Sequence, residues 1–102
     1  MTSQANRAFY TLDPELRLVG ASPNTLRIWG KQPRDVIGRK LVEVFPWVDG
    51  APVHEALQQA LQTYAPVRLR VNSVVMAKSV EVEIYPVRDG LQVSFAPIDD
   101  QA

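Results

Sequence analysis

A chain of 102 residues is long enough for one domain with one hydrophobic core and too short for a second, so we take residues 1–102 as a single domain. Its 11 basic and 11 acidic side chains cancel, which leaves no charge signature of binding to nucleic acid or to a membrane surface, and no apolar run is long enough to span a bilayer. The sequence contains no cysteine, which excludes disulfides, thiolate nucleophiles and cysteine metal ligands and agrees with a cytoplasmic location.

Two strands joined by a tight turn are predicted at the start of the chain. Residues 1–6 are polar, and we expect them to be frayed. Residues 8–12 favour a first strand and residues 16–21 a second one. Between them, Asp13-Pro14-Glu15 is a turn with proline at a favoured position. We therefore expect the two strands to form a hairpin.

Three short helical segments are predicted within residues 22–46. Ser22-Pro23 is a helix start, because the hydroxyl caps free N–H groups and the first turn does not need the N–H that proline lacks; Gly30 ends this segment. A second segment runs from residue 33 to Gly38, and a third carries apolar residues at helical spacing until Pro46. Isolated helices this short are unstable in water, so a broad apolar surface such as a sheet must hold them.

One longer helix is predicted over residues 51–64. Its apolar residues recur at helical spacing and form a single stripe, while glutamines occupy the opposite side and Pro66 prevents continuation. The stripe consists of Val53, Ala56, Leu57, Ala60, Leu61 and Tyr64.

Three strands are predicted in the last part of the chain, at residues 67–75, 79–87 and 91–96. In each of them apolar and polar side chains alternate, which is typical of an antiparallel sheet with one buried face and one wet face. On the last strand the wet face is expected to carry Gln92, Ser94 and Ala96.

Two further features concern how these strands pair. Asp89-Gly90 favours a type I′ hairpin turn, in which both central residues need a positive φ. Arg68 and Arg70 alternate along one strand, and Glu81 and Glu83 along its expected neighbour. Opposite charges facing each other across the pair would support its register.

The order of these elements, together with four short motifs, resembles the PAS sensory domains. The motifs are SP at residues 22–23, IWG at 28–30, VIGR at 36–39 and IYPVRDGL at 84–91, and the resemblance covers about residues 8–98. It implies an α+β fold: a five-stranded antiparallel sheet, with the first hairpin beside the last strands, and short helices plus one longer helix packed on one face.

The residue types offer little for catalysis or metal binding. His54 is the sole histidine, and Glu55 beside it points elsewhere around the helix, so we expect neither an enzyme nor a metal site. Some PAS domains bind haem through a histidine on this helix. His54 lies at the edge of the apolar stripe, however, and we prefer to interpret it as a half-exposed boundary residue. An unrelated small α+β enzyme is the least favoured alternative.

Flavin is the second cofactor to consider. The adduct formed in light-oxygen-voltage domains needs a cysteine, which this chain lacks. A noncovalent flavin stacked on Trp29 stays an alternative, although packing of Trp29 in the core is preferred. We therefore expect no cofactor, with flavin and haem as alternatives, and a colourless domain that co-purifies no stoichiometric small molecule.

The resemblance implies a regulatory module of a bacterial-type signal transduction protein, such as a histidine kinase of a two-component system. In one version a small apolar ligand occupies a cavity between sheet and helices. In the other the core is filled, and the domain forms a homodimer or docks onto other domains of its protein; the lack of an evident inward polar anchor slightly favours this version. The candidate pocket walls are Trp29, Ile37, Leu41, Phe45, Leu57, Leu61, Val82, Ile84, Val93 and Phe95.

The C-terminal end departs from the family pattern. Many PAS domains carry an Asp-Ile-Thr motif there, whereas this chain has Pro97-Ile98-Asp99. The leading aspartate is missing and the proline removes a ladder donor, which puts signal output through the usual C-terminal segment in question.

Overall fold

The structure, a computed structural model, describes residues 7–73 and 78–98. The predictions made for residues 1–6, for positions 74 and 75 and for Asp99 lie outside the described residues. Within the described ranges, no helix has both the length and the apolar character needed to cross a bilayer.

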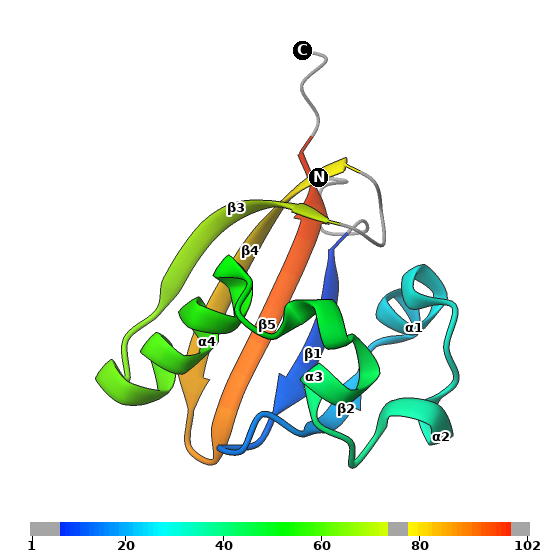
Figure 1. Ribbon diagram of the computed structural model, residues 1–102, viewed down its shortest axis with the longest axis horizontal. Helices are drawn as coiled ribbons and strands as arrows, with labels where there is room; N and C mark the ends of the chain where they lie inside the picture. Colours follow the sequence, from blue (N-terminus) through cyan, green and yellow to red (C-terminus); the bar gives the residue numbers. More distant parts are fainter. Residues whose placement is uncertain (1–6, 74–77, 99–102) are drawn as a thin grey trace.

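A five-stranded antiparallel sheet forms one layer of the molecule (Figure 1). Strands β1 (Ala8–Leu12) and β2 (Leu18–Ala21) make the first hairpin, and β3 (Val67–Ser73), β4 (Lys78–Val87) and β5 (Gly90–Pro97) follow the helices. The spatial order is β2-β1-β5-β4-β3, so the first strand pairs with the last one. The expected α+β fold, with its first hairpin beside the last strands, is confirmed.

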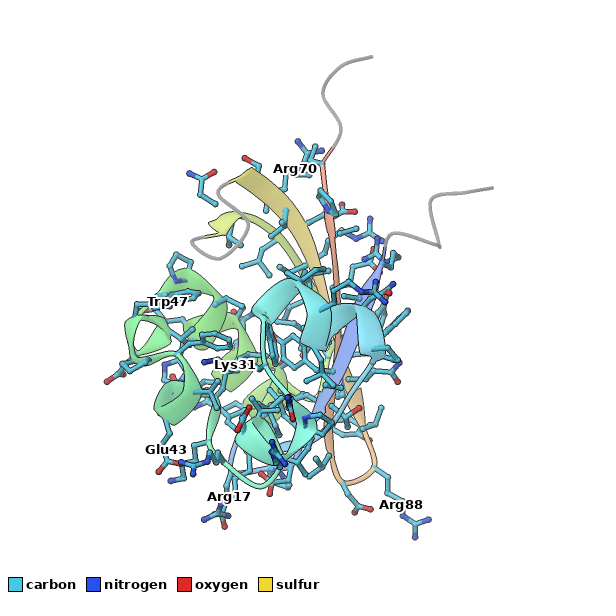
Figure 2. The ribbon with its side chains drawn as sticks, turned by 90° about the vertical axis from the view of Figure 1, so that its right-hand side faces the viewer. Arg17, Lys31, Glu43, Trp47, Arg70 and Arg88 are labelled. Atoms are coloured by element: carbon cyan, nitrogen blue, oxygen red, sulfur yellow. The ribbon has the colours of Figure 1, made fainter. Side chains whose placement is uncertain are left out.

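The helices form the second layer, on one face of the sheet (Figure 1). They are α1 (Pro23–Trp29), α2 (Pro33–Val36), α3 (Leu41–Val44), the 3-10 helix η2 (Pro46–Val48) and the longer α4 (Pro52–Thr63). Seen from the side, the helical layer lies to one side of the strands (Figure 2). The core fills the space between the two layers.

Burial follows the predicted alternation on the inner face of the sheet. Val82, Ile84, Val93 and Phe95 are at most 8% exposed and face the helices, where Leu57 of α4 is completely buried. On β4 and β5, alternate apolar side chains therefore enter the core, as expected for a sheet that is covered on one side.

The late hairpin turns at a different place from the one predicted. Val87 pairs with Gly90, so Arg88 and Asp89 are the central turn residues, and neither has the positive φ that a type I′ turn requires. The predicted turn type is wrong. Arg88 marks the tip of the hairpin in Figure 2.

Three single residues also differ from the predictions. Leu16 was expected to begin the second strand but has φ 64° in the preceding turn, so β2 begins at Leu18. Tyr64 was expected to close the apolar stripe but is the left-handed C-cap of α4 and 64% exposed. Ser94 was expected on the wet face but is 4% exposed, because Arg7 lies over it and donates a hydrogen bond to its hydroxyl at 3.0 Å.

Candidate functional site

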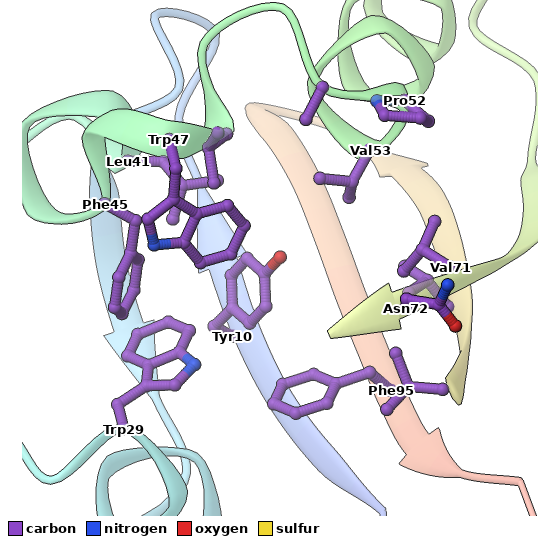
Figure 3. A pocket seen from close by; sticks show the side chains of 14 residues that line it. Tyr10, Trp29, Leu41, Phe45, Trp47, Pro52, Val53, Val71, Asn72 and Phe95 are labelled. Atoms are coloured by element: carbon purple, nitrogen blue, oxygen red, sulfur yellow. The ribbon is translucent and has the colours of Figure 1, made fainter. Parts of the chain in front are cut away.

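A cavity of about 120 Å³ lies between the sheet and the helices and opens to solvent on one side. Strands β1, β3, β4 and β5 form its floor, and α1, α3, η2 and the start of α4 form its walls (Figure 3). The lining is mostly apolar and aromatic: Tyr10, Trp29, Leu41, Phe45, Trp47, Val48, Ala51, Pro52, Val53, Val71, Asn72, Val80, Val82 and Phe95.

Aromatic rings form a continuous cluster along one side of the cavity. Trp29 lies between Tyr10 and Phe45, with ring centroids 5.2 and 5.0 Å away. Phe45 continues to Trp47 at 5.7 Å, and Tyr10 continues to Phe95 at 5.9 Å. The rings are tilted or edge-on to one another, which is the favourable geometry for aromatic pairs. The cluster gives the cavity a continuous aromatic wall.

The side chain of Tyr10 brings a polar group to the floor of the cavity. Tyr10 is 7% exposed, and its hydroxyl oxygen points into the open space (Figure 3). Burial raises the pKa of Tyr10 above its ordinary value, so the phenol keeps its proton. The hydroxyl is therefore available as a hydrogen-bond donor inside an apolar pocket.

The position of Trp29 is fixed by the way α1 begins. The Ser22 hydroxyl accepts hydrogen bonds from the N–H groups of Thr25 at 3.3 Å and Phe9 at 3.2 Å, which caps the helix and ties it to β1. The buried Thr25 hydroxyl donates to the carbonyl of Phe9 at 2.7 Å. Gly30 ends α1 with φ 67°, as predicted, directly after the cavity residue Trp29.

A hydrogen-bonded segment, Gly38–Leu41, holds the α3 wall against the first hairpin. The N–H of Gly38 donates to the carbonyl of Leu18 at 2.7 Å, and the N–H of Leu18 donates to the carbonyl of Arg39 at 2.9 Å. The N–H of Leu41 then donates to the carbonyl of Leu16 at 2.9 Å. Leu41, a cavity residue, is therefore bonded directly to the β1–β2 hairpin.

Half of the predicted pocket residues border the cavity. Trp29, Leu41, Phe45, Val82 and Phe95 all do so, and they come from α1, α3, the loop after α3, β4 and β5. The fold therefore brings together side chains that are far apart in the sequence. Their role in ligand binding stays a prediction.

The other five predicted pocket residues do not border the cavity. Leu57, Ile84 and Val93 are fully buried in the adjoining core, and Leu61 is partly buried against it. Ile37 follows α2 and is 41% exposed, so its assignment to the pocket is corrected. A short helix can turn only one side inward, and α2 uses Val36 for this contact.

His54 lies near the start of α4 and does not border the cavity. Its Nδ1 accepts a hydrogen bond from the N–H of Gly50 at 3.4 Å and lies 4.0 Å from a carboxylate oxygen of Asp49. This places the imidazole at the turn before the helix. Among the described residues, no group of histidine, aspartate and glutamate side chains is arranged to hold a metal ion.

Sequence reasoning missed Tyr10 as a pocket residue. The signal was available, because Tyr10 stands between Ala8 and Leu12 in the alternating pattern of the first strand and so must face inward. A buried tyrosine normally finds a partner for its hydroxyl, which is why this position deserved weight as a polar anchor. The contributions of Trp47 and Asn72 at the rim could not be anticipated, since they depend on how η2 and β3 are placed.

The outer face of the sheet carries an ion-pair network. Arg68 on β3 pairs across the ladder with Glu83 on β4, as predicted, with 3.3 Å between guanidinium and carboxylate. Arg7 approaches the other oxygen of Glu83 at 3.6 Å, and the Tyr85 hydroxyl donates to that oxygen at 2.9 Å. The predicted charge pairing across β3 and β4 is confirmed for Arg68 and Glu83.

Solved structures resemble this architecture over nearly its full length. A sensory box sensor histidine kinase from Vibrio cholerae has a TM-score of 0.84 at 10% identity, covering 96% of this chain and 86% of that one. The PAS domain of histidine kinase ThkA has a TM-score of 0.75 at 18% identity, covering 92% and 98%. The PAS domain of the quorum-sensing receptor RpfR from Cronobacter turicensis, in complex with BDSF, has a TM-score of 0.75 at 16% identity, covering 97% and 100%.

These identities are low, so the superpositions show the shared fold. No curated protein sequence matches the chain significantly. A family model described as the PAS fold matches residues 2–98, which is nearly the whole chain. This protein therefore belongs to the PAS family.

Proposed function

We propose that this PAS domain is a non-catalytic sensory module that takes up a small, mostly apolar molecule between its sheet and its short helices. The observation that carries the proposal is the cavity of about 120 Å³, with its aromatic wall and one open side. The sequence alone slightly favoured a filled core, and the open space beside Tyr10 and Phe95 reverses that preference. Pockets of this kind, apolar with a few polar groups, are the usual form of small-molecule sites.

The helical wall is the part of the domain that a ligand could displace at least cost. Helices α2 and α3 have four residues each, so they depend on packing and on single caps. The Asp35 carboxylate accepts a hydrogen bond from the N–H of Gln32, and the Glu43 carboxylate accepts one from the N–H of Lys40, both at 3.1 Å. A ligand that contacts Leu41 would shift a population of wall conformations rather than perform chemistry.

The change would reach the first hairpin through Leu41, whose N–H is bonded to the carbonyl of Leu16. From β1 the displacement would pass to β5, in which Leu91–Phe95 pair with the whole of β1. Two of the similar structures come from histidine kinases and a third is a receptor domain with a bound ligand, which supports a signalling protein of this kind as the host.

The size of the cavity bears on the cofactor alternatives. An engineered cavity of about 150 Å³ binds benzene, so a volume of about 120 Å³ corresponds to a single ring. Flavin and haem are larger, and His54 lies outside the cavity. We therefore keep the expectation of a colourless domain.

Native mass spectrometry and ligand-induced thermal stabilisation test the proposal. In Figure 3 Val53 points toward the cavity, so Val53→Phe would fill it and abolish stabilisation by single-ring aromatic compounds. Val19→Phe is the matched control, because Val19 is 52% exposed and does not border the cavity. Equal binding by the wild type and Val53→Phe would overturn the proposal.

Protein docking through the outer face of the sheet is the second candidate function. Phe9 and Tyr85 are 41% and 42% exposed there, so the outer face presents two aromatic side chains to solvent. A homodimer or a contact with another domain of the host protein would cover them. Sedimentation of the wild type and of Phe9→Ser tests this: the variant should be more monomeric, and a wild type that stays monomeric at high concentration argues against the homodimer.

A further inference from the structure

The cavity contains a hydrogen-bond donor that the protein itself does not use. In the described part of the chain, no residue supplies a partner for the Tyr10 hydroxyl, although Tyr10 is only 7% exposed. No side-chain polar atom of the described residues is both fully buried and unpaired, so this hydroxyl reaches the accessible space of the cavity, where an occupant can pair with it. Because the oxygen points into the cavity (Figure 3), the missing partner belongs to whatever occupies that space.

The other polar groups of the cavity narrow the chemistry of this occupant. The N–H edge of Trp29 is turned toward the same space in Figure 3, so a second donor stands near the first. Asn72 lies at the exposed rim, where its side-chain oxygen accepts a hydrogen bond from Ser79 at 2.9 Å. None of the residues that line the described cavity carries a charge. A carboxylate or an ammonium group would therefore lose its hydration without gaining an ionic partner among the lining residues; Lys31, outside that lining, has its Nζ 5.9 Å from the centroid of the Phe45 ring.

Shape and size narrow the chemistry further. Trp29, Phe45 and Trp47 form the continuous aromatic wall, and the volume of about 120 Å³ is that of one ring with a small substituent. Planar rings gain most from such walls, since they stack or meet them edge-on. Burial raises the pKa of Tyr10, so the phenol stays a hydrogen-bond donor in alkaline solution as well.

We propose that the pocket binds a neutral molecule the size of one aromatic ring, whose carbonyl or comparable oxygen accepts a hydrogen bond from the Tyr10 hydroxyl. This inference rests on the proposed sensory function and names the ligand class. A ligand of this class gives the Tyr10 hydroxyl an acceptor and leaves no charge unpaired. Tyr10 is then the residue that orients the ligand and makes the pocket prefer it to a hydrocarbon of the same size.

Three probes of nearly equal size and shape test the proposal: acetophenone, α-methylstyrene and benzoate. They offer a neutral acceptor, no acceptor, and a charged acceptor on the same ring. Dissociation constants are measured by NMR titration of the wild type and of Tyr10→Phe, with unfolding curves to establish that the variant is folded. Val53→Phe serves to show that binding occurs in the cavity.

The expected result is a change of preference. Tyr10→Phe should raise the dissociation constant of acetophenone about three- to tenfold, which is the effect of losing one neutral hydrogen bond. The affinity for α-methylstyrene should be unchanged or higher in Tyr10→Phe, because this probe leaves no donor unpaired in the variant. Benzoate should bind the wild type more weakly than acetophenone does. As a measurement that needs no variant, the carbonyl stretching frequency of bound acetophenone should fall below its value in hydrocarbon solvent.

The outcomes distinguish the Tyr10 anchor from the sensory pocket on which it rests. If both neutral probes bind in the cavity but Tyr10→Phe affects them equally, or if the carbonyl frequency is unshifted, the Tyr10 anchor is wrong and the sensory pocket stands. If benzoate binds best, the neutral ligand class is wrong. If neither neutral probe binds the wild type, the anchor and the proposed sensory pocket both fall.

Discussion

The β4–β5 hairpin closes onto the first strand through a contact between Gly90 and Leu12. A Cβ atom at Gly90 would lie 1.9 Å from the carbonyl oxygen of Leu12, and Gly90 has φ 151°, which L side chains rarely adopt. Leu12 is fully buried and pairs with Leu91 on β5, so its backbone has no room to move away. Glycine is required here by the approach of two strands.

Gly90→Ala should therefore lower the free energy of unfolding by about 3 kcal/mol, at the upper end of what an inserted methyl group costs in a packed core. Urea unfolding measures this loss. Gly20→Ala is the control, because Gly20 is also in the sheet but has nothing within 4 Å of its Cβ position. The control should change stability by less than about 0.5 kcal/mol. Similar losses in both variants would contradict the contact.

Glu83 is the centre of the outer-face network, and Glu83→Gln removes its charge while keeping its shape. Both Arg68 and Arg7 then lose an ionic partner, at 3.3 and 3.6 Å. We expect a loss of about 1 kcal/mol in the free energy of unfolding, which shrinks at high salt because partly exposed pairs are screened. The matched control is Glu81→Gln, which stands opposite Arg70 on the same strand pair. An equal loss in the control would mean that net charge matters and the Arg68–Glu83 geometry does not.

Regular patterns made most of the fold predictable from the sequence. The alternation in the strands and the apolar stripe of the long helix each record burial on one side, so the inward residues of β4 and β5 could be named in advance. Ser22 and Gly30 marked the ends of α1 because capping is a local interaction. The prediction of a type I′ turn at Asp89-Gly90 failed because it used a local pattern to explain a glycine that is required by a tertiary contact. Gly90 is needed because the backbone of Leu12 lies too close to allow a side chain at this position.

The candidate site was only partly predictable, because a cavity depends on how elements pack. Ile37 and Leu41 look equivalent in the sequence, yet one is 41% exposed and the other 3%. The difference comes from the backbone bonds that join Leu41 to Leu16, which no local pattern reveals. Tyr10 could have been found from its inward position, but that its hydroxyl has no described partner could not.

Ser22 connects the α1 wall of the pocket to β1, so its removal should affect both. Ser22→Ala deletes the acceptor for the N–H groups of Thr25 and Phe9 and should cost about 1–2 kcal/mol of unfolding free energy. Ser22→Asn keeps a capping oxygen and should recover most of that loss. Amide hydrogen exchange at Thr25 should rise in the alanine variant. If the asparagine variant is as unstable as the alanine one, capping is not the function of this side chain.

Tyr10 gives the domain a specific response to alkaline pH. Burial raises the pKa of Tyr10 in the folded state, so the folded protein keeps the phenol proton at pH values where the unfolded chain has released it. The stability that this group contributes is therefore complete below the unfolded pKa of about 10 and is lost as pH rises above it, by up to about 1.4 kcal/mol per pH unit. Tyr10→Phe has no such titration and provides the reference.

Urea unfolding of the wild type and Tyr10→Phe at about pH 8 and about pH 11 isolates this effect, because every other titrating group is common to both proteins. Between the two conditions, the wild type should lose about 1 kcal/mol more than the variant. If the wild type and Tyr10→Phe lose stability in parallel, the Tyr10 hydroxyl is in contact with bulk water, and the apolar environment that makes it a selective donor in the pocket does not exist.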